Sequence, residues 1–112
     1  MSLLTADDIS LECINRGNIK TINKFSQDSR EITPGDCFIC IKGEKVDGHS
    51  FLSQVKKASC IIGSDRDALI SACTNDQYVF IAPNIQKAVH ELASLAREKS
   101  NKPVITITGA SG

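Results

Sequence analysis

The segment from residue 104 to residue 112 constrains the possible folds of this chain more than any other. Residues 104–108 form a short run rich in β-branched side chains, and the small turn Gly109-Ala110-Ser111-Gly112 follows directly. A buried strand enters a nucleotide-binding loop in this way. In a complete loop Lys and then Ser or Thr follow, because the ammonium group neutralises phosphate charge and the hydroxyl group holds Mg²⁺. We therefore expect the front part of a longer ATP- or GTP-using protein; the alternative is a β-turn after an edge strand.

The composition favours one domain without a membrane span. The chain has 112 residues, 41% of them hydrophobic, which suffices for one core. No apolar run approaches the roughly 20 residues of a spanning helix, and the N-terminus lacks the basic region of a secretory signal. Thirteen basic and thirteen acidic residues cancel, and aromatic residues make up 4% of the chain. We expect a cytoplasmic monomer that binds neither nucleic acid nor membranes.

The five cysteines indicate free thiols in a reducing compartment, because their number is odd and their spacing fits no disulfide framework. Cys37 and Cys40 form a CxxC motif inside a predicted strand. Positions i and i+3 of a strand point to opposite faces, so the two sulfurs would not converge on a metal or form a redox pair. We expect two small buried side chains and no metal site.

Helical and strand patterns alternate along the chain. Helices are predicted at residues 6–16, 50–57, 65–73 and 85–99, and strands at 19–25, 37–41, 60–62, 79–81 and 104–108. The helix at 85–99 has the clearest apolar stripe, and Asn84 caps it. The pattern predicts an α/β fold with a small mixed sheet flanked by helices. A break near residue 103 predicts one domain at 1–102, with 103–112 as the first strand and the start of the phosphate-binding loop of a second domain.

Two polar loops contain candidate binding residues. Asp28-Ser29-Arg30 combines a carboxylate, a hydroxyl group and a guanidinium group, which together can grip a phosphate and read the edge of a base or sugar. The alternative is a capping turn with a surface arginine.

The second loop spans residues 42–51. Gly43 and Gly48 would allow close approach of a ligand, and a helix starting at Ser50 would offer backbone N–H groups to an anion, with His49 beside it. The alternative is a flexible surface loop with a solvated histidine.

Four short motifs, in this order and spacing, resemble the N-terminal domain of the Mur ligases, the ATP-dependent enzymes that extend the peptide of the peptidoglycan precursor. They are Asp28-Ser29-Arg30, Pro34-Gly35-Asp36, the stretch from Phe38 to Gly43-Glu44, and Asp47-Gly48-His49-Ser50-Phe51. Thr108-Gly109-Ala110-Ser111-Gly112 matches the first five positions of the Thr-Gly-x-x-Gly-Lys-Thr loop that opens the central domain of these enzymes. The resemblance covers residues 25–112.

The resemblance implies a function for each motif. Asp28, Ser29 and Arg30 would contact the uridine of a UDP-N-acetylmuramoyl-peptide, and Gly48, His49 and Ser50 would lie near its ribose and diphosphate. Thr108, Gly109, Ala110, Ser111 and Gly112 would begin the ATP loop. ATP with Mg²⁺ would phosphorylate the terminal carboxylate of the peptide, which the incoming amine then attacks. The catalytic residues would lie beyond Gly112, so we expect these 112 residues to bind the UDP end, to bind neither ATP nor Mg²⁺, and to be inactive alone.

Two branches of the family are alternatives. The MurF branch adds D-alanyl-D-alanine to the UDP-muramoyl tripeptide, and another branch adds diaminopimelate or lysine to the dipeptide. The second branch usually has Thr-Asn between the loop glycines, whereas Ala110-Ser111 resembles the MurF pair, so we favour MurF. Two further alternatives are a non-catalytic binding module and an unrelated nucleotide hydrolase with a leading domain.

Overall fold

The computed structural model describes residues 4–41, 47–99 and 105–106, and the side chains of Lys99, Ile105 and Thr106 are not described. The strands are β1 (Leu4–Thr5), β2 (Glu12–Asn15), β3 (Thr21–Ile22), β4 (Phe25–Ser26), β5 (Cys37–Ile39), β6 (Cys60–Gly63), β7 (Tyr78–Ile81) and β8 (Ile105–Thr106). The α-helices are α1 (Arg66–Ala72) and α2 (Ile85–Lys99), and the 3₁₀ helices are η1 (Ala6–Asp8), η2 (Ser29–Glu31) and η3 (Gly48–Gln54).

A mixed sheet organises the described residues, as the sequence predicts. Its strand order is β2-β7-β6-β5-β4-β8, and β1 pairs with β3 in a separate two-stranded ribbon. Strands β7, β6, β5, β4 and β8 run parallel, whereas β2 joins the edge antiparallel to β7. The predicted α/β fold with a small mixed sheet flanked by helices is therefore confirmed.

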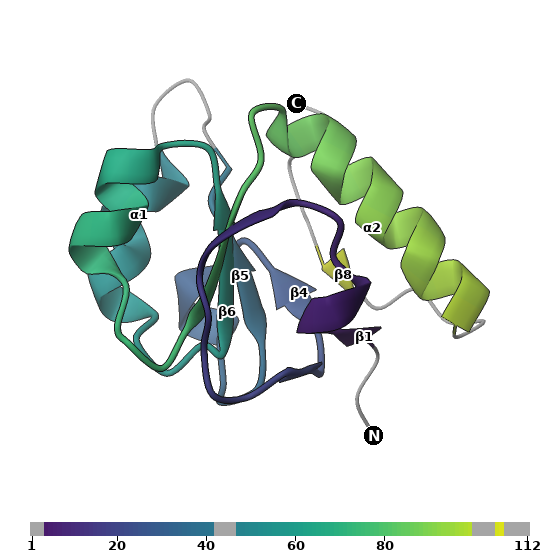
Figure 1. The fold of residues 1–112 in the computed structure, drawn as a ribbon, viewed down its shortest axis with the longest axis horizontal. Helices are drawn as coiled ribbons and strands as arrows, with labels where there is room; N and C mark the ends of the chain where they lie inside the picture. Colours follow the sequence, from purple (N-terminus) through teal and green to yellow (C-terminus); the bar gives the residue numbers. More distant parts are fainter. Residues whose placement is uncertain (1–3, 42–46, 100–104, 107–112) are drawn as a thin grey trace.

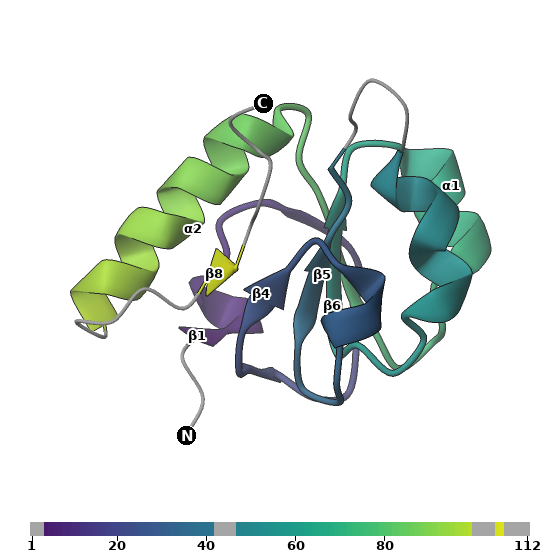
Figure 2. The same cartoon turned by 180° about the vertical axis from the view of Figure 1, so that it is seen from behind.

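The order of the strands explains why helices cover both faces of the sheet. From β4 the chain adds β5, β6 and β7 in one direction, through η2, η3 and α1. It then returns through α2 to place β8 on the other side of β4. Because β-strand crossovers are right-handed, reversing the direction moves the crossing helix to the opposite face. Figures 1 and 2 show α1 and α2 on opposite sides of the sheet.

Each face of the sheet has its own apolar core. Along β5 the side chains alternate, so that Cys37 and Ile39 pack under α2 with Phe25 and Leu92, whereas Phe38 packs toward α1 and η3. Strands covered on both faces read as continuous apolar runs, which is why the short runs at 37–41, 60–62 and 79–81 are recognisable in the sequence.

The CxxC motif follows the same alternation. Cys37 belongs to the core under α2 and Cys40 to the opposite core, and both thiols are buried. The predicted placement of the two sulfurs on opposite faces is confirmed. Among the described residues, no group of three His, Cys, Asp or Glu side chains is arranged to hold a metal ion.

The predicted helix at residues 6–16 is wrong. The chain forms one 3₁₀ turn at Ala6–Asp8, where the Asp8 carboxylate accepts the backbone N–H of Thr5 at 2.8 Å. It then forms β2, which hydrogen-bonds along β7. The apolar stripe of this segment is incomplete, so the open edge of β7 outweighs the local helical preference.

Other predicted elements also differ in their limits. The predicted strand at 19–25 divides into β3 and β4, which join different sheets, and the predicted helix at 50–57 is the 3₁₀ helix η3, which begins at Gly48. Of the predicted strand at 104–108, residues 105–106 form β8, which pairs with β4 in the same sheet, and the others lie outside the described residues. The predicted division into domains at residue 103 stays a prediction.

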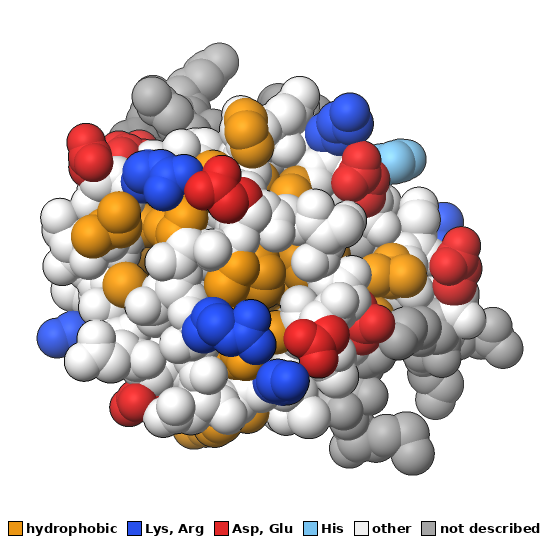
Figure 3. Space-filling model, in the orientation of Figure 1, with side chains coloured by type: hydrophobic (Ala, Val, Ile, Leu, Met, Phe, Trp, Pro, Cys, Tyr) orange, Lys and Arg blue, Asp and Glu red, His pale blue; other side chains and the backbone are white. Residues whose placement is uncertain are grey.

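The face of the molecule drawn in Figure 3 is mixed in charge. On the face in Figure 3, Lys and Arg side chains lie among Asp and Glu side chains, and hydrophobic side chains are visible between them. Among the helices that the structure describes, none is both long and apolar enough to cross a membrane.

The thiols are expected to differ in reactivity. Cys13 is exposed and Cys73 half-buried, whereas Cys37, Cys40 and Cys60 are buried. Burial raises the pKa of Cys37 and of Cys40, which keeps these thiols protonated and unreactive. In a time course with Ellman's reagent, Cys13 should react first and Cys73 next, and the other three should react only after unfolding in urea. A Cys13→Ser variant that keeps the fast phase would contradict this order.

Candidate functional site

The Asp28 turn and the described part of the second predicted loop, from residue 47 onward, lie at the same edge of the sheet, whereas residues 42–46, with Gly43, lie outside the described residues. Because β4, β5 and β8 are parallel, their carboxyl ends meet at one edge. The turn at Asp28 follows β4, and the segment leading to η3 follows β5. Successive strands after β4 are added on one side of it, whereas β8 is added on the other side. Open α/β sheets bind ligands at the point where the direction of addition reverses in this way, beyond the carboxyl ends of the strands.

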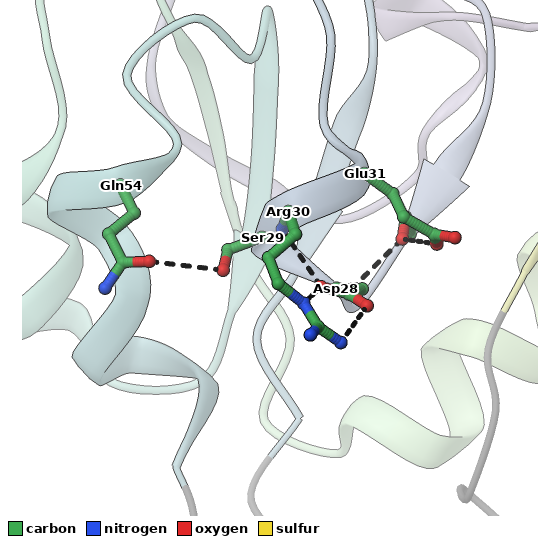
Figure 4. A network of polar contacts seen from close by, with 6 residues as sticks. Asp28, Ser29, Arg30, Glu31 and Gln54 are labelled. Carbon is green, nitrogen blue, oxygen red and sulfur yellow. Dashed lines mark hydrogen bonds and ion pairs between the residues drawn. The ribbon is translucent and has the colours of Figure 1, made fainter.

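The Asp28 turn is held by its own side chains (Figure 4). Asp28 caps η2, since its Oδ1 accepts the backbone N–H of Arg30 at 2.9 Å and the Arg30 Nε–H at 3.0 Å. Its Oδ2 accepts from Arg30 Nη2 at 3.0 Å. Hydrogen bonding from the Arg30 side chain lowers the pKa of Asp28, and the same bond raises the pKa of Arg30. The Arg30 side chain is 87% exposed, so its remaining N–H groups face solvent in a fixed orientation.

Ser26 fixes this turn to the end of β4. Its buried hydroxyl oxygen accepts the backbone N–H of Asp28 at 3.0 Å, and the hydroxyl group donates to Glu31 Oε2 at 3.4 Å. Sequence reasoning missed Ser26 and Glu31. The available signal was the serine two residues before Asp28, because a serine hydroxyl group commonly accepts the backbone N–H of residue i+2.

Ser29 connects the turn to a residue that sequence reasoning also missed. Its hydroxyl group donates to Gln54 Oε1 at 3.4 Å, and Figure 4 shows the two side chains facing each other between η2 and η3. Gln54 ends η3, whereas Gly48, His49 and Ser50 begin it. The described contacts therefore join Ser29 to the last residue of η3, whereas Gly48, His49 and Ser50 lie at its first turn.

The backbone N–H groups at the start of η3 are already bonded within the protein. Gly48 donates to Ile41 O at 2.9 Å, His49 to Asp47 Oδ1 at 3.0 Å, and Ser50 to Asp47 O at 2.9 Å. The Ser50 hydroxyl group also donates to Asp47 O, at 2.7 Å. In this structure these N–H groups are not open to an anion, in contrast to the expectation for a helix that starts at Ser50.

The His49 ring is buried and makes three hydrogen bonds. Its side chain is 6% exposed, and Nδ1 lies 2.7 Å from Asp47 Oδ1. Nε2 accepts the backbone N–H groups of Ser64 and Asp65, each at 3.1 Å. The ring fits because residue 63 is glycine: a Cβ atom there would lie 2.7 Å from Nε2. The alternative of a solvated histidine on a surface loop is therefore wrong.

The predicted start of the ATP loop, Thr108 to Gly112, lies outside the described residues. Thr106 in β8 pairs with Ser26 in β4, so the chain leaves β8 at the edge where the Asp28 turn begins. A pocket of about 260 Å³, which sequence reasoning missed, lies at this edge beyond β5, β6 and β7. Its lining residues are Ile41, Ser64, Pro83, Asn84, Ile85 and Gln86.

Comparison with known proteins identifies the family. The family model described as "Mur ligase family, catalytic domain" matches residues 21–106. The chain belongs to the Mur ligase family. It is 32% identical over 96 residues to UDP-N-acetylmuramyl-tripeptide synthetase 2 of Oceanobacillus iheyensis, which covers 82% of this chain and 19% of that protein. It is also 32% identical over 93 residues to UDP-N-acetylmuramoyl-tripeptide--D-alanyl-D-alanine ligase of Escherichia coli, covering 82% of this chain and 20% of that protein.

A solved structure supports the fold of this Mur ligase chain. The crystal structure of MurF from Acinetobacter baumannii matches with a TM-score of 0.59 and 23% identity, over 79% of this chain and 22% of that one. The chain spans about a fifth of the length of the curated relatives it matches. The likeness therefore concerns one part of a longer ligase architecture.

The pKa of Asp28 is expected to depend on Arg30. In a ¹³C carboxyl titration, Asp28 should titrate below its ordinary 3.8, and in an Arg30→Ala variant its pKa should rise toward that value, because only the backbone N–H remains as a donor. Since the pKa is lowered on folding, the pair stabilises the fold above about pH 3.8, and this contribution is lost as the pH falls through the folded-state value. Equal titration curves for the two proteins would contradict the assignment.

Proposed function

We propose that this chain is the UDP-binding N-terminal part of an ATP-dependent ligase that adds D-alanyl-D-alanine to UDP-N-acetylmuramoyl-tripeptide during peptidoglycan precursor synthesis. Membership of the Mur ligase family supports the class of reaction. One of the relatives at 32% identity has this activity in its name. By the motif resemblance, Asp28, Ser29, Arg30, Gly48, His49 and Ser50 belong to the site for the UDP moiety.

The observation that carries the proposal is the fixed turn of Asp28, Ser29 and Arg30 at the carboxyl end of β4. Asp28 orients the Arg30 guanidinium group through two side-chain hydrogen bonds, so little conformational entropy is lost when Arg30 meets an anionic ligand. The outward N–H groups of Arg30 suit the diphosphate or a uracil carbonyl oxygen. The Ser29 oxygen retains lone pairs beside them.

Binding of the UDP moiety would act at a distance from the reacting carboxylate. Energy from a remote part of a substrate positions its reacting end, so this part of the chain would supply orientation. ATP would supply the phosphoryl group that activates the carboxylate, with its phosphates and Mg²⁺ at the loop that begins with Thr108, Gly109, Ala110, Ser111 and Gly112. The catalytic residues themselves are expected after Gly112.

The principal alternative is the branch that adds diaminopimelate or lysine to UDP-N-acetylmuramoyl-dipeptide. The Oceanobacillus iheyensis relative is a tripeptide synthetase by name and has the same 32% identity as the MurF relative. The pair Ala110-Ser111 between the loop glycines supports MurF over this branch.

Binding of UDP should depend on Arg30. In a ¹⁵N NMR titration of this chain with UDP, we expect shifts at Ser29 and Arg30, and none with ATP·Mg²⁺. Arg30→Ala should raise the dissociation constant about tenfold, because a charge-assisted contact is lost. The control is Arg66→Ala, which removes an exposed arginine paired with Glu12 and should leave binding unchanged. Equal effects of the two variants would contradict the proposed site.

The branch is tested with the ligase of which this chain forms the N-terminal part. Phosphate release from ATP should require UDP-N-acetylmuramoyl-tripeptide together with D-alanyl-D-alanine. The competing pair is UDP-N-acetylmuramoyl-dipeptide with diaminopimelate or lysine, and turnover with that pair alone would assign the protein to the other branch. Binding of UDP without turnover of either pair would indicate a non-catalytic binding module.

A further inference from the structure

His49 links two segments of the carboxyl edge that are distant in sequence. Its backbone lies in the first turn of η3, and its ring reaches the turn between β6 and α1, fifteen residues further along the chain. There Nε2 accepts the N–H groups of Ser64 and Asp65 at 3.1 Å each. On its other side the ring meets Asp47 at 2.7 Å, and Asp47 itself caps η3.

The hydrogen bonds define the state of the ring. Two N–H groups point at Nε2, so this nitrogen carries no proton, and the neutral ring has its proton on Nδ1 and donates it to Asp47. Both ring nitrogens are thus engaged within the protein. The side chain is also 6% exposed, which leaves no ring atom placed for a hydrogen bond with a ligand.

We propose that His49 is a positioning residue of the UDP site, which acts by fixing Gly48 and Ser50 at the carboxyl edge without touching the ligand. This inference rests on the proposed function, in which Gly48 and Ser50 belong to that site. It assigns His49 a different task from its neighbours, since the Ser50 side chain is exposed and the His49 ring is not.

The packing around the ring shows that the position of η3 depends on it. Gly48 approaches the end of β5 so closely that a Cβ atom there would lie 2.7 Å from Ile41 N. Gly63 leaves space for the ring at the end of β6. Without the ring, the N–H groups of Ser64 and Asp65 would lose their acceptor, and the first turn of η3 would lose its link to β6. Ser64 and Asp65 are exposed, so water would replace the ring as the partner of their N–H groups, and nothing in this contact would then hold η3 to the turn after β6.

The two halves of the link can be separated by two amide substitutions. In His49→Gln the amide reaches the place of Nε2, so its oxygen can accept from Ser64 and Asp65. In His49→Asn the shorter amide reaches only the place of Nδ1, so it can pair with Asp47 but not with Ser64 or Asp65. The same pair of changes at His90, an exposed residue of α2, provides the matched control.

The experiment measures the dissociation constant for UDP and the hydrogen exchange of the Ser64 and Asp65 amides in each variant of the chain. We expect His49→Asn to raise the dissociation constant about tenfold and to lose protection of both amides. His49→Gln should keep the protection and bind UDP within about threefold of the unchanged chain. Rescue by Gln but not by Asn is not expected of a ring that only fills space, and both His90 variants should behave like the unchanged chain.

Three outcomes would overturn the inference. If all variants bind UDP equally, His49 has no positioning role. If His49→Gln binds as weakly as His49→Asn while its Ser64 and Asp65 amides stay protected, the ring itself contacts the ligand. If the unchanged chain shows no UDP binding, the proposed function fails and the positioning role fails with it; this case is recognised before any variant is compared.

Discussion

The parallel pairing of β4, β5, β6 and β7 is the constraint on which the rest of this structure depends. Parallel neighbours cannot be joined by tight turns, so each connection must cross a face of the sheet and cover it. The connections from β4 to β7 cover one face, and the return through α2 to β8 covers the other, so all three residues of β5 lie in the interior. Because these strands are parallel, every crossover begins at the same edge of the sheet, and the candidate binding residues lie at that edge.

The four crossovers begin with the same kind of side-chain cap. Each begins with an Asp or Asn whose Oδ1 accepts a backbone N–H group: Asp28 from Arg30, Asp47 from His49, Asp65 from Ala68 and Asn84 from Lys87. These side chains satisfy N–H groups that would otherwise have no partner at the edge of the sheet. They also occupy donors that an anionic ligand would use. Arg30, held by Asp28 and largely exposed, is thus a better candidate for contact with a phosphate than the backbone at Gly48–Ser50.

The residues that touch a ligand and those that place them need not coincide at this edge. Ser26 and Glu31 hold the Asp28 turn, and Gln54 pairs with Ser29. The buried His49 ring holds η3 to the turn after β6. A motif such as Asp47-Gly48-His49-Ser50 therefore contains exposed groups together with groups that stabilise the fold. The exposure of each side chain tells the two kinds apart.

Much of the architecture is determined by the sequence alone, because the signals are local. The apolar runs of β5, β6 and β7, the stripe and Asn84 cap of α2, and the opposite faces of Cys37 and Cys40 all depend on neighbours within a few residues. The family is also recognisable from the sequence, since its motifs are short and ordered. Tertiary structure alone decided the strand β2, which replaces a predicted helix because β7 offers an edge, and the pairing of β8 with β4. It also decided the burial of His49 and the contact of Ser29 with Gln54, because their partners lie 15 and 25 residues away, and no local pattern specifies which distant donor or acceptor a polar side chain will meet.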